Sequence, residues 1–129
     1  MFVTLHMVST NNGRQDILKD DIQLALSMVD ARDQANRVWM ADSFKTALNK
    51  NATALVIITQ ADVTKTLGAS LCTADNRINC DAFKHFRQQI KYESKNFAKR
   101  GEKARPVLLI HGDSNPYCMD KKFGGKTAA

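Results

Sequence analysis

Side chains that could bind a metal ion or a phosphate follow an aliphatic run in the last third of the sequence. Residues 107–110 are Val-Leu-Leu-Ile, and His111, Gly112, Asp113 and Asn115 come directly after them. A short, unbroken aliphatic run is typical of a β-strand buried on both faces of a parallel sheet. Ligands of open α/β sheets bind at the carboxyl ends of the strands. We therefore expect His111 to contact metal or phosphate, and Asp113 and Asn115 to be metal ligands.

A second aliphatic run, residues 54–59, ends in the same way at Gln60 and Asp62, and the first predicted strand is followed by Asn11 and Asn12. In a parallel sheet these positions share one edge with the residues that follow the last strand. Gln60 is accordingly a candidate metal ligand, and Asn11, Asn12 and Asp62 are candidate substrate contacts. Asn-Asn-Gly is also a turn sequence, and Asp62 could instead cap a helix.

Structural roles remain open for several of these polar residues. His111 could bond a backbone carbonyl at the end of its strand, and Asp113 could form an Asx-turn. Asn115 precedes a proline and could be a turn residue alone. His6 lies inside the first predicted strand and is expected in the core. His85 lies on a predicted helix and is expected at the surface.

The elements that must position these residues alternate between strand and helix. Helical spacing and capping residues predict helices that start after Asp33 and Asp81. The predicted elements are a strand at 2–8, a helix at 34–50, a strand at 54–59, a helix at 82–100 and a strand at 107–110. Helices between successive strands indicate an α/β fold in one domain, with a mostly parallel sheet and crossover helices.

Each predicted helix carries an apolar stripe that should face the sheet. The stripe residues are Trp39, Met40, Phe44, Ala47 and Leu48 in the first helix, and Phe83, Phe86, Ile90 and Phe97 in the second. Residues 14–32 are predicted as a loop with a helical segment. Residues 63–80 are predicted as an insertion loop, and residues 116–129 as an irregular basic tail.

Three cysteines without a Cys-x-x-Cys pair argue against a zinc site built on thiolates. Cys72 and Cys80 flank a short polar loop. They could form a disulfide in an oxidising compartment or remain free thiols in the cytosol, and the sequence leaves both open.

The formal charge of +6 is uneven along the chain. Residues 1–80 hold 8 basic and 8 acidic side chains, whereas residues 81–129 hold 11 and 5. This excess suits an anionic partner, or simply a solvated helix face and tail. The basic residues are not interleaved with aromatics in a nucleic-acid-binding motif, which argues against nucleic acid. No apolar run reaches the roughly 18 residues of a membrane span, and no signal peptide is predicted, so a cytoplasmic location is the default expectation.

Taken in order, these motifs resemble the C-terminal half of a calcineurin-like metallophosphoesterase. The matching pieces are Trp39-Met40 in a helix, a strand ending at Gln60-Ala61-Asp62, and a strand ending at Gly112-Asp113-Ser114-Asn115. The resemblance covers roughly residues 1 to 120, and one subgroup of the family reads His-Gly-Asp-Ser/Thr-His at the last motif. It implies a partial αββα sandwich and a hydrolase that binds two divalent metals (manganese, iron or zinc) to attack a phosphate ester.

The chain departs from the family's pattern at the metal ligands. The upstream motifs Asp-x-His, Gly-Asp and Gly-Asn-His-Asp/Glu are absent, Gln60 replaces a histidine, and Asp113 and Asn115 replace the two histidines of the last motif. Amide oxygens are weak ligands, so these residues do not make a dinuclear site. We expect phosphoester hydrolysis to be deficient in this chain alone. We also expect a homodimer, or a complementary half-domain, to cover an exposed apolar sheet edge.

Two other classes of function stay open. Residues 107–112 also resemble the oxyanion strand of an α/β-hydrolase, but the nearest nucleophile string, Gly68-Ala69-Ser70-Leu71-Cys72, lacks its last glycine and follows no predicted strand. The other class is a non-catalytic binding or structural remnant. A phosphoesterase requires metal, a serine hydrolase reacts with fluorophosphonates, and a binding module does neither.

Overall fold

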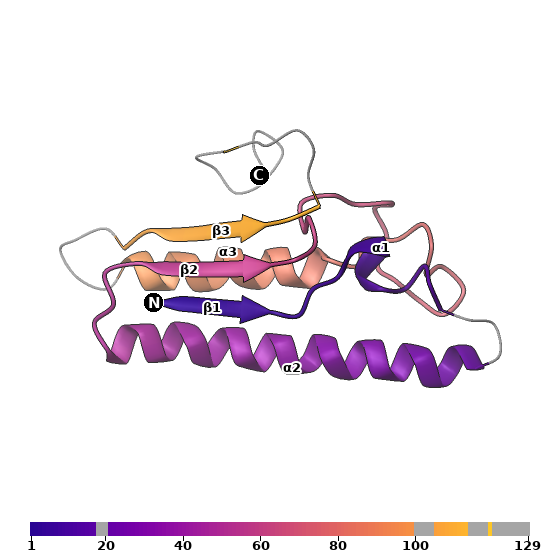
Figure 1. Cartoon of the computed structure of the whole chain (residues 1–129), viewed down its shortest axis with the longest axis horizontal. Coiled ribbons are helices and arrows are strands. Elements are labelled where there is room, and N and C mark those ends of the chain that lie inside the picture. Colours follow the sequence, from indigo (N-terminus) through magenta and orange to yellow (C-terminus); the bar gives the residue numbers. More distant parts are fainter. Residues whose placement is uncertain (18–20, 100–104, 114–118, 120–129) are drawn as a thin grey trace.

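The structure is a computed structural model that describes residues 1–17, 21–99, 105–113 and 119. Its elements are β1 (Phe2–Leu5), α1 (Ser9–Asn12), α2 (Ile22–Asn49), β2 (Leu55–Thr59), α3 (Lys84–Lys99) and β3 (Val107–His111) (Figure 1). The strands form one sheet in the order β1-β2-β3, and both neighbouring pairs are parallel. The predicted mixed α/β class with a parallel sheet is confirmed.

Both long helices pack on the same face of the sheet. Val3 of β1 and Ile57 of β2 are buried in one cluster with Met40 and Phe44 of α2 and Phe97 of α3. In Figure 1, α3 runs behind the strands and α2 runs alongside β1. The rings of Phe44 and Phe97 meet edge to face with centroids 5.9 Å apart, which ties the two helices together. The inward stripe predicted for the second helix is confirmed.

The opposite face of the sheet carries a second set of side chains, which we call the open face. Its members alternate along the strands with the buried residues: Phe2 and Thr4 of β1, Val56 and Ile58 of β2, and Leu108 and Ile110 of β3. Residues 107–110 were predicted to be buried on both faces, and this is wrong. Leu108 and Ile110 are 51% and 46% exposed, because the helices that follow β1 and β2 both return over the other face.

Helix α2 is longer than the sequence predicted. Residues 22–32, predicted as part of a loop with a helical segment, belong to it entirely, and Asp33 lies in its interior rather than at its N-terminus. The helix begins after Asp21, whose carboxylate accepts a hydrogen bond of 3.0 Å from the Leu24 amide. Asp21 is therefore the cap of this helix.

The first strand ends earlier than predicted, at Leu5 instead of residue 8. There the backbone of His6 leaves the sheet and exchanges two hydrogen bonds with the Asn36 side chain, at 3.0 and 2.9 Å. His6 itself is exposed and lies outside the strand, so its predicted core position is wrong. The chain turns away from the sheet because an amide on α2 satisfies its backbone groups.

Two further helix predictions differ from the structure. Trp39 was assigned to the buried stripe of α2 but is 57% exposed, with its indole N–H donating to the Thr4 carbonyl at 3.2 Å. Helix α3 begins at Lys84, and the Asp81 carboxylate forms an ion pair with Arg87 instead of capping the helix. Among the described residues, no helix combines the length and apolar character needed to cross a membrane.

Candidate functional site

The carboxyl ends of the three strands are joined into one edge. The Ala61 amide donates to the Met7 carbonyl at 3.1 Å, which ties β2 to the segment after β1. The Ser9 amide donates to the Gln60 side-chain oxygen at 3.0 Å, so this predicted metal ligand is committed to a backbone bond. Gln60, Asp62, Lys65, His111 and Asp113 lie at this edge, and we call them the carboxyl-edge site.

An imidazole and a carboxylate meet at the centre of the carboxyl-edge site. His111 Nδ1 lies 3.7 Å from Asp62 Oδ1, and both side chains are largely buried. His111 is the register partner of Thr59 at the end of β2, so it projects on the helix-covered side of the sheet. The sequence placed both residues at this edge, and the structure brings them together. The same Nδ1 lies 3.1 Å from the Gly112 carbonyl oxygen, which is the backbone contact that the sequence left open for this histidine.

The position of Asp62 is fixed by the turn that it starts. Its Oδ1 accepts hydrogen bonds from the Thr64 amide at 3.0 Å and the Thr64 hydroxyl at 2.6 Å, a local cap of the kind that short polar side chains form. Lys65 follows, with Nζ 3.9 Å from Asp62 Oδ2 and 3.2 Å from the Asp113 carbonyl oxygen. Lys65 therefore links the loop after β2 to the loop after β3.

The backbone at the end of β3 is held in a narrow space. The Gly112 amide donates to the Thr59 carbonyl at 3.3 Å, and a Cβ at Gly112 would lie only 2.8 Å from the Gln60 carbonyl oxygen. Only glycine fits there without a shift of the neighbouring strand end. Asp113 then adopts φ of 61°, a left-handed conformation that few residues other than glycine adopt. Such conformations concentrate at functional sites.

The segment after β1 is also left-handed. Thr10, Asn11 and Asn12 have φ of 56°, 56° and 59°, so α1 is a left-handed turn that Gly13 ends. Consecutive left-handed residues are rare because each costs roughly 1–2 kcal/mol. The turn presents the Ser9 amide to Gln60 and directs Asn11 and Asn12 into the protein interior.

The side chains of Asn11 and Asn12 are used internally, and the structure does not direct them toward the other predicted site residues. Asn11 Nδ2 donates to the Arg77 carbonyl at 3.2 Å and contacts Cys80 Sγ at 3.1 Å. Asn12 Nδ2 donates to Asp33 at 2.6 Å, and its oxygen accepts from Arg32 at 3.1 Å. Both side chains support the turn from within the protein.

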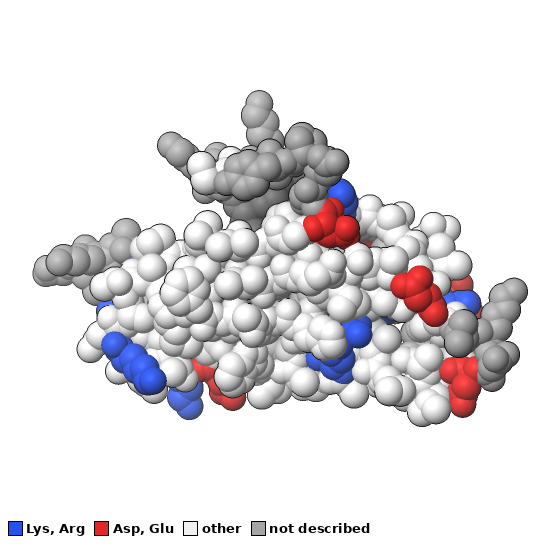
Figure 2. Space-filling model, viewed as in Figure 1, with Lys and Arg blue, Asp and Glu red and all other residues white. Residues whose placement is uncertain are grey.

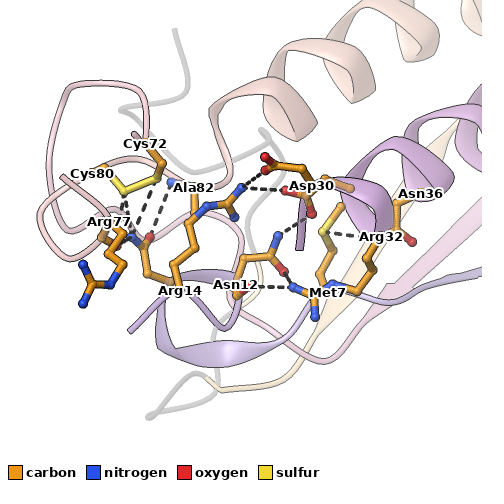
Figure 3. A network of polar contacts seen from close by, with 12 residues as sticks. Met7, Asn12, Arg14, Asp30, Arg32, Asn36, Cys72, Arg77, Cys80 and Ala82 are labelled. Atoms are coloured by element: carbon orange, nitrogen blue, oxygen red, sulfur yellow. Dashed lines mark hydrogen bonds and ion pairs between the residues drawn. A yellow bond between two sulfur atoms is a disulfide. The ribbon is translucent and has the colours of Figure 1, made fainter. Parts of the chain in front are cut away.

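A buried arginine anchors the same turn to α2 (Figure 3). Arg14 bridges Asp30 at 3.1 Å and Asp33 at 3.0 Å, with only 8% of its side chain exposed. Arg32 donates to the Asn12 carbonyl at 2.6 Å. Asp30 and Asp33 of α2 are therefore partners of Arg14, which local sequence patterns could not reveal.

Cys72 and Cys80 form a disulfide within the irregular residues 63–80. Asn11 Nδ2 lies 3.1 Å from Cys80 Sγ and 3.9 Å from Cys72 Sγ, so the loop after β2 packs on the turn after β1. Ser70, in the string considered as a hydrolase nucleophile, lies in this loop, and its hydroxyl accepts from Asn76 at 2.8 Å. It is not in a strand-to-helix elbow.

Lys65 and Ser9 were missed by sequence reasoning. Lys65 stands three residues after Asp62, and a tight turn brings side chains at this spacing together. The spacing could therefore have identified Lys65 as a site residue. Asn115 and the tail at 116–129 lie outside the described residues, Met119 excepted. Within the described part of the chain, no group of three or more His, Cys, Asp or Glu side chains is arranged to hold a metal ion.

No known relative adds to this geometry. No protein-family model matches the chain, and no curated protein or solved structure matches it significantly.

Proposed function

We propose that this chain is a metallophosphoesterase-like module that binds a divalent metal ion and a phosphate ester, or a similar small anion, at the carboxyl-edge site. The observation that carries the proposal is the contact of 3.7 Å between His111 and Asp62 at the ends of two neighbouring parallel strands. The resemblance of Gln60-Ala61-Asp62 and His111-Gly112-Asp113 to metallophosphoesterase motifs supports the same reading.

The side chains present fit one metal ion better than two. Imidazole and carboxylate together suit manganese, iron or zinc, and His111 and Asp62 would hold such an ion. The Gln60 oxygen is uncharged and already accepts the Ser9 amide, which makes it a weaker ligand than the Asp62 carboxylate. A bound ion would act as a Lewis acid and orient the phosphate. We therefore propose that this chain alone is deficient in two-metal hydrolysis and that a complementary half-domain or a further segment completes the αββα sandwich.

Electrostatics links binding of the anion to binding of the metal. The carboxyl-edge site holds two carboxylates, from Asp62 and Asp113, against the ammonium group of Lys65 and the imidazole of His111. Without a metal ion, the negative carboxylates repel a phosphate, whereas a bound divalent cation would make the local charge positive. Lys65 is exposed and near both loops, so it can contact the anion directly. Phosphate should accordingly bind only after the metal.

Metal binding tests this proposal. The chain, purified without a histidine tag, is titrated with zinc and with manganese by calorimetry, beside the variants His111→Ala and Asp62→Asn and the control His85→Ala, an exposed histidine on α3. We expect about one ion per chain, an affinity reduced at least about 100-fold in the two site variants because each loses a direct ligand, and no change in the control. Failure of the native chain to bind either metal, or equal loss in the control, would refute the metal site.

Phosphate binding and hydrolysis separate the possible functions. With the metal bound, we expect inorganic phosphate to bind, and Lys65→Ala to weaken it. Hydrolysis of an activated phosphodiester should be slow and abolished by chelator. Phosphate binding without metal would instead identify a non-catalytic anion-binding module, and reaction with a fluorophosphonate would identify a serine hydrolase.

A further inference from the structure

Asn12 and Gly13 form an Asn-Gly pair, and every other asparagine in the chain is followed by a residue that carries a side chain. In a flexible chain, asparagine before glycine is the most prone to deamidation, because glycine has no Cβ to hinder the approach of its nitrogen to the asparagine side chain. Asparagine is one of the thermolabile residues of proteins. The turn after β1 therefore contains a residue that can change chemically without an enzyme.

Deamidation at this pair needs only water as a reactant. The Gly13 nitrogen bonds to Asn12 Cγ, the Cγ–Nδ2 bond breaks, and Nδ2 leaves as ammonia with the proton of the Gly13 amide. Water then opens the succinimide ring that has formed. Addition of water at Cγ gives aspartate, whereas addition at the main-chain carbonyl carbon gives isoaspartate, whose backbone is one carbon longer. No oxidant, metal ion or partner takes part.

The folded chain keeps both reacting groups from this reaction. Asn12 is only 1% exposed, its amide donates to Asp33 at 2.6 Å, and its oxygen accepts from Arg32 at 3.1 Å (Figure 3). The Gly13 amide, which must lose its proton to attack, donates to the Ser9 carbonyl at 3.0 Å. The reaction can therefore begin only after the turn has opened and the Asn12 side chain has left these partners.

We propose that Asn12 is a site of spontaneous deamidation that the fold suppresses, so that chains which open at this turn are modified and closed chains are not. Water can reach the turn as soon as it opens, because Gly13 is only half-buried and Gln15 and Asp16 are exposed. Figure 2 shows acidic side chains at the surface on the end of the molecule where α1 lies in Figure 1, so the turn lies beneath a polar surface. This inference is independent of the proposed function.

Both products disturb the turn. Aspartate replaces the amide that donates to Asp33 at 2.6 Å with a second carboxylate, and like charges this close repel each other. Arg32 offsets part of this repulsion, because it already contacts the Asn12 oxygen. Isoaspartate adds a backbone atom to the ring that the hydrogen bond from the Gly13 amide to the Ser9 carbonyl closes, so it should disturb the turn more. A chain that is modified while unfolded should therefore fail to regain the native turn.

Peptide mapping by mass spectrometry tests the proposal by following the conversion of Asn12 in the full chain, folded and in urea, at the same mildly alkaline pH. Asp33→Ala removes a partner of Asn12. Asp30→Ala is the matched control, because both aspartates pair with Arg14 but the Asn12 amide donates to Asp33. Thermal unfolding shows that each variant is folded during the incubation. Arg32→Ala, which removes the bond to the Asn12 oxygen, takes the place of Asp33→Ala if that variant does not fold.

We expect the native chain to deamidate at least about tenfold more slowly when folded than in urea, and Asp33→Ala, but not Asp30→Ala, to deamidate faster in the folded state. After dilution from urea, modified chains should be depleted from the refolded fraction that size-exclusion chromatography isolates. Equal rates in the folded and unfolded chain would overturn the proposal, as would equal rates in the two folded variants. Modified chains that refold as completely as unmodified ones would overturn the predicted loss of the turn.

Discussion

The left-handed turn after β1 predicts that glycine at residue 12 gives a more stable protein than alanine, which is the opposite of the usual rule for helices. Asn12 has φ of 59° and is only 1% exposed. Its amide donates to the Asp33 carboxylate at 2.6 Å, and its oxygen accepts from Arg32 at 3.1 Å and from the Val8 amide at 3.4 Å. Truncation of this side chain removes both the hydrogen bonds and a residue type that tolerates the left-handed region.

The magnitudes can be estimated for two truncations. Loss of the hydrogen bond to the Asp33 carboxylate costs about 1.5–3 kcal/mol in either case. In Asn12→Ala, the methyl group adds about 1–2 kcal/mol for the left-handed conformation. In Asn12→Gly this term is absent, and the extra freedom of glycine in the unfolded chain costs about 0.5–1 kcal/mol instead. We expect the glycine variant to be the more stable of the two by about 0.5–1 kcal/mol.

Urea denaturation of the native chain and both variants measures these differences, with unchanged m-values showing that the unfolded state is comparable. Ala35→Gly in α2 is the control, because an exposed site in a right-handed helix should lose about 1 kcal/mol on the same change. If Asn12→Ala proves as stable as Asn12→Gly, or more stable, the turn is not left-handed in solution and the reasoning fails.

Three further predictions address other parts of the structure. Gly112→Ala should destabilise the protein by about 1–3 kcal/mol in denaturant, because the new Cβ would meet the Gln60 carbonyl oxygen, and no change would show that the strand ends have room to move. Reduction of the Cys72–Cys80 disulfide, eight residues apart, should cost about 2–3 kcal/mol, and the double Cys→Ala variant should be insensitive to reductant. Burial raises the pKa of Glu93 above its usual 4.5, so the folded state disfavours the charged carboxylate. The contribution of Glu93 to stability should therefore fall as the pH rises through that raised pKa, and Glu93→Gln should lessen this fall in thermal melts between pH 4 and 7, whereas an unchanged pH profile would contradict it.

The sequence predicted the order of the elements because the order depends on local patterns. The apolar runs ending at Thr59 and Ile110 are strands, and the stripe through Phe86 and Ile90 faces the sheet. The start of α2 was missed because the acidic residues near residue 20 resemble a break in the apolar spacing. Asp21 is instead the helix cap, and such a cap can be recognised only once the helix beyond it is known.

Tertiary contacts explain the remaining errors. Asp33 resembles a helix cap locally, but it lies inside α2, where it accepts from Arg14 nearly twenty residues away in sequence. The aliphatic sequence of β3 shows that the side chains on both faces of the strand are apolar. It does not show which element covers each face. For this reason burial was predicted for Leu108 and Ile110, which are in fact exposed. Asn11 and Asn12 follow β1 as expected, yet the left-handed turn directs their amides inward.

The carboxyl-edge site and the open face lie on opposite sides of the same strand. Along β3, Leu108 and Ile110 belong to the open face, whereas His111 projects on the side that the helices cover. A charge at Leu108 should therefore leave the affinity for zinc unchanged, whereas His111→Ala should lower it. If Leu108→Lys abolished metal binding while the protein remained folded, a partner that packs on the open face would have to contribute to the site.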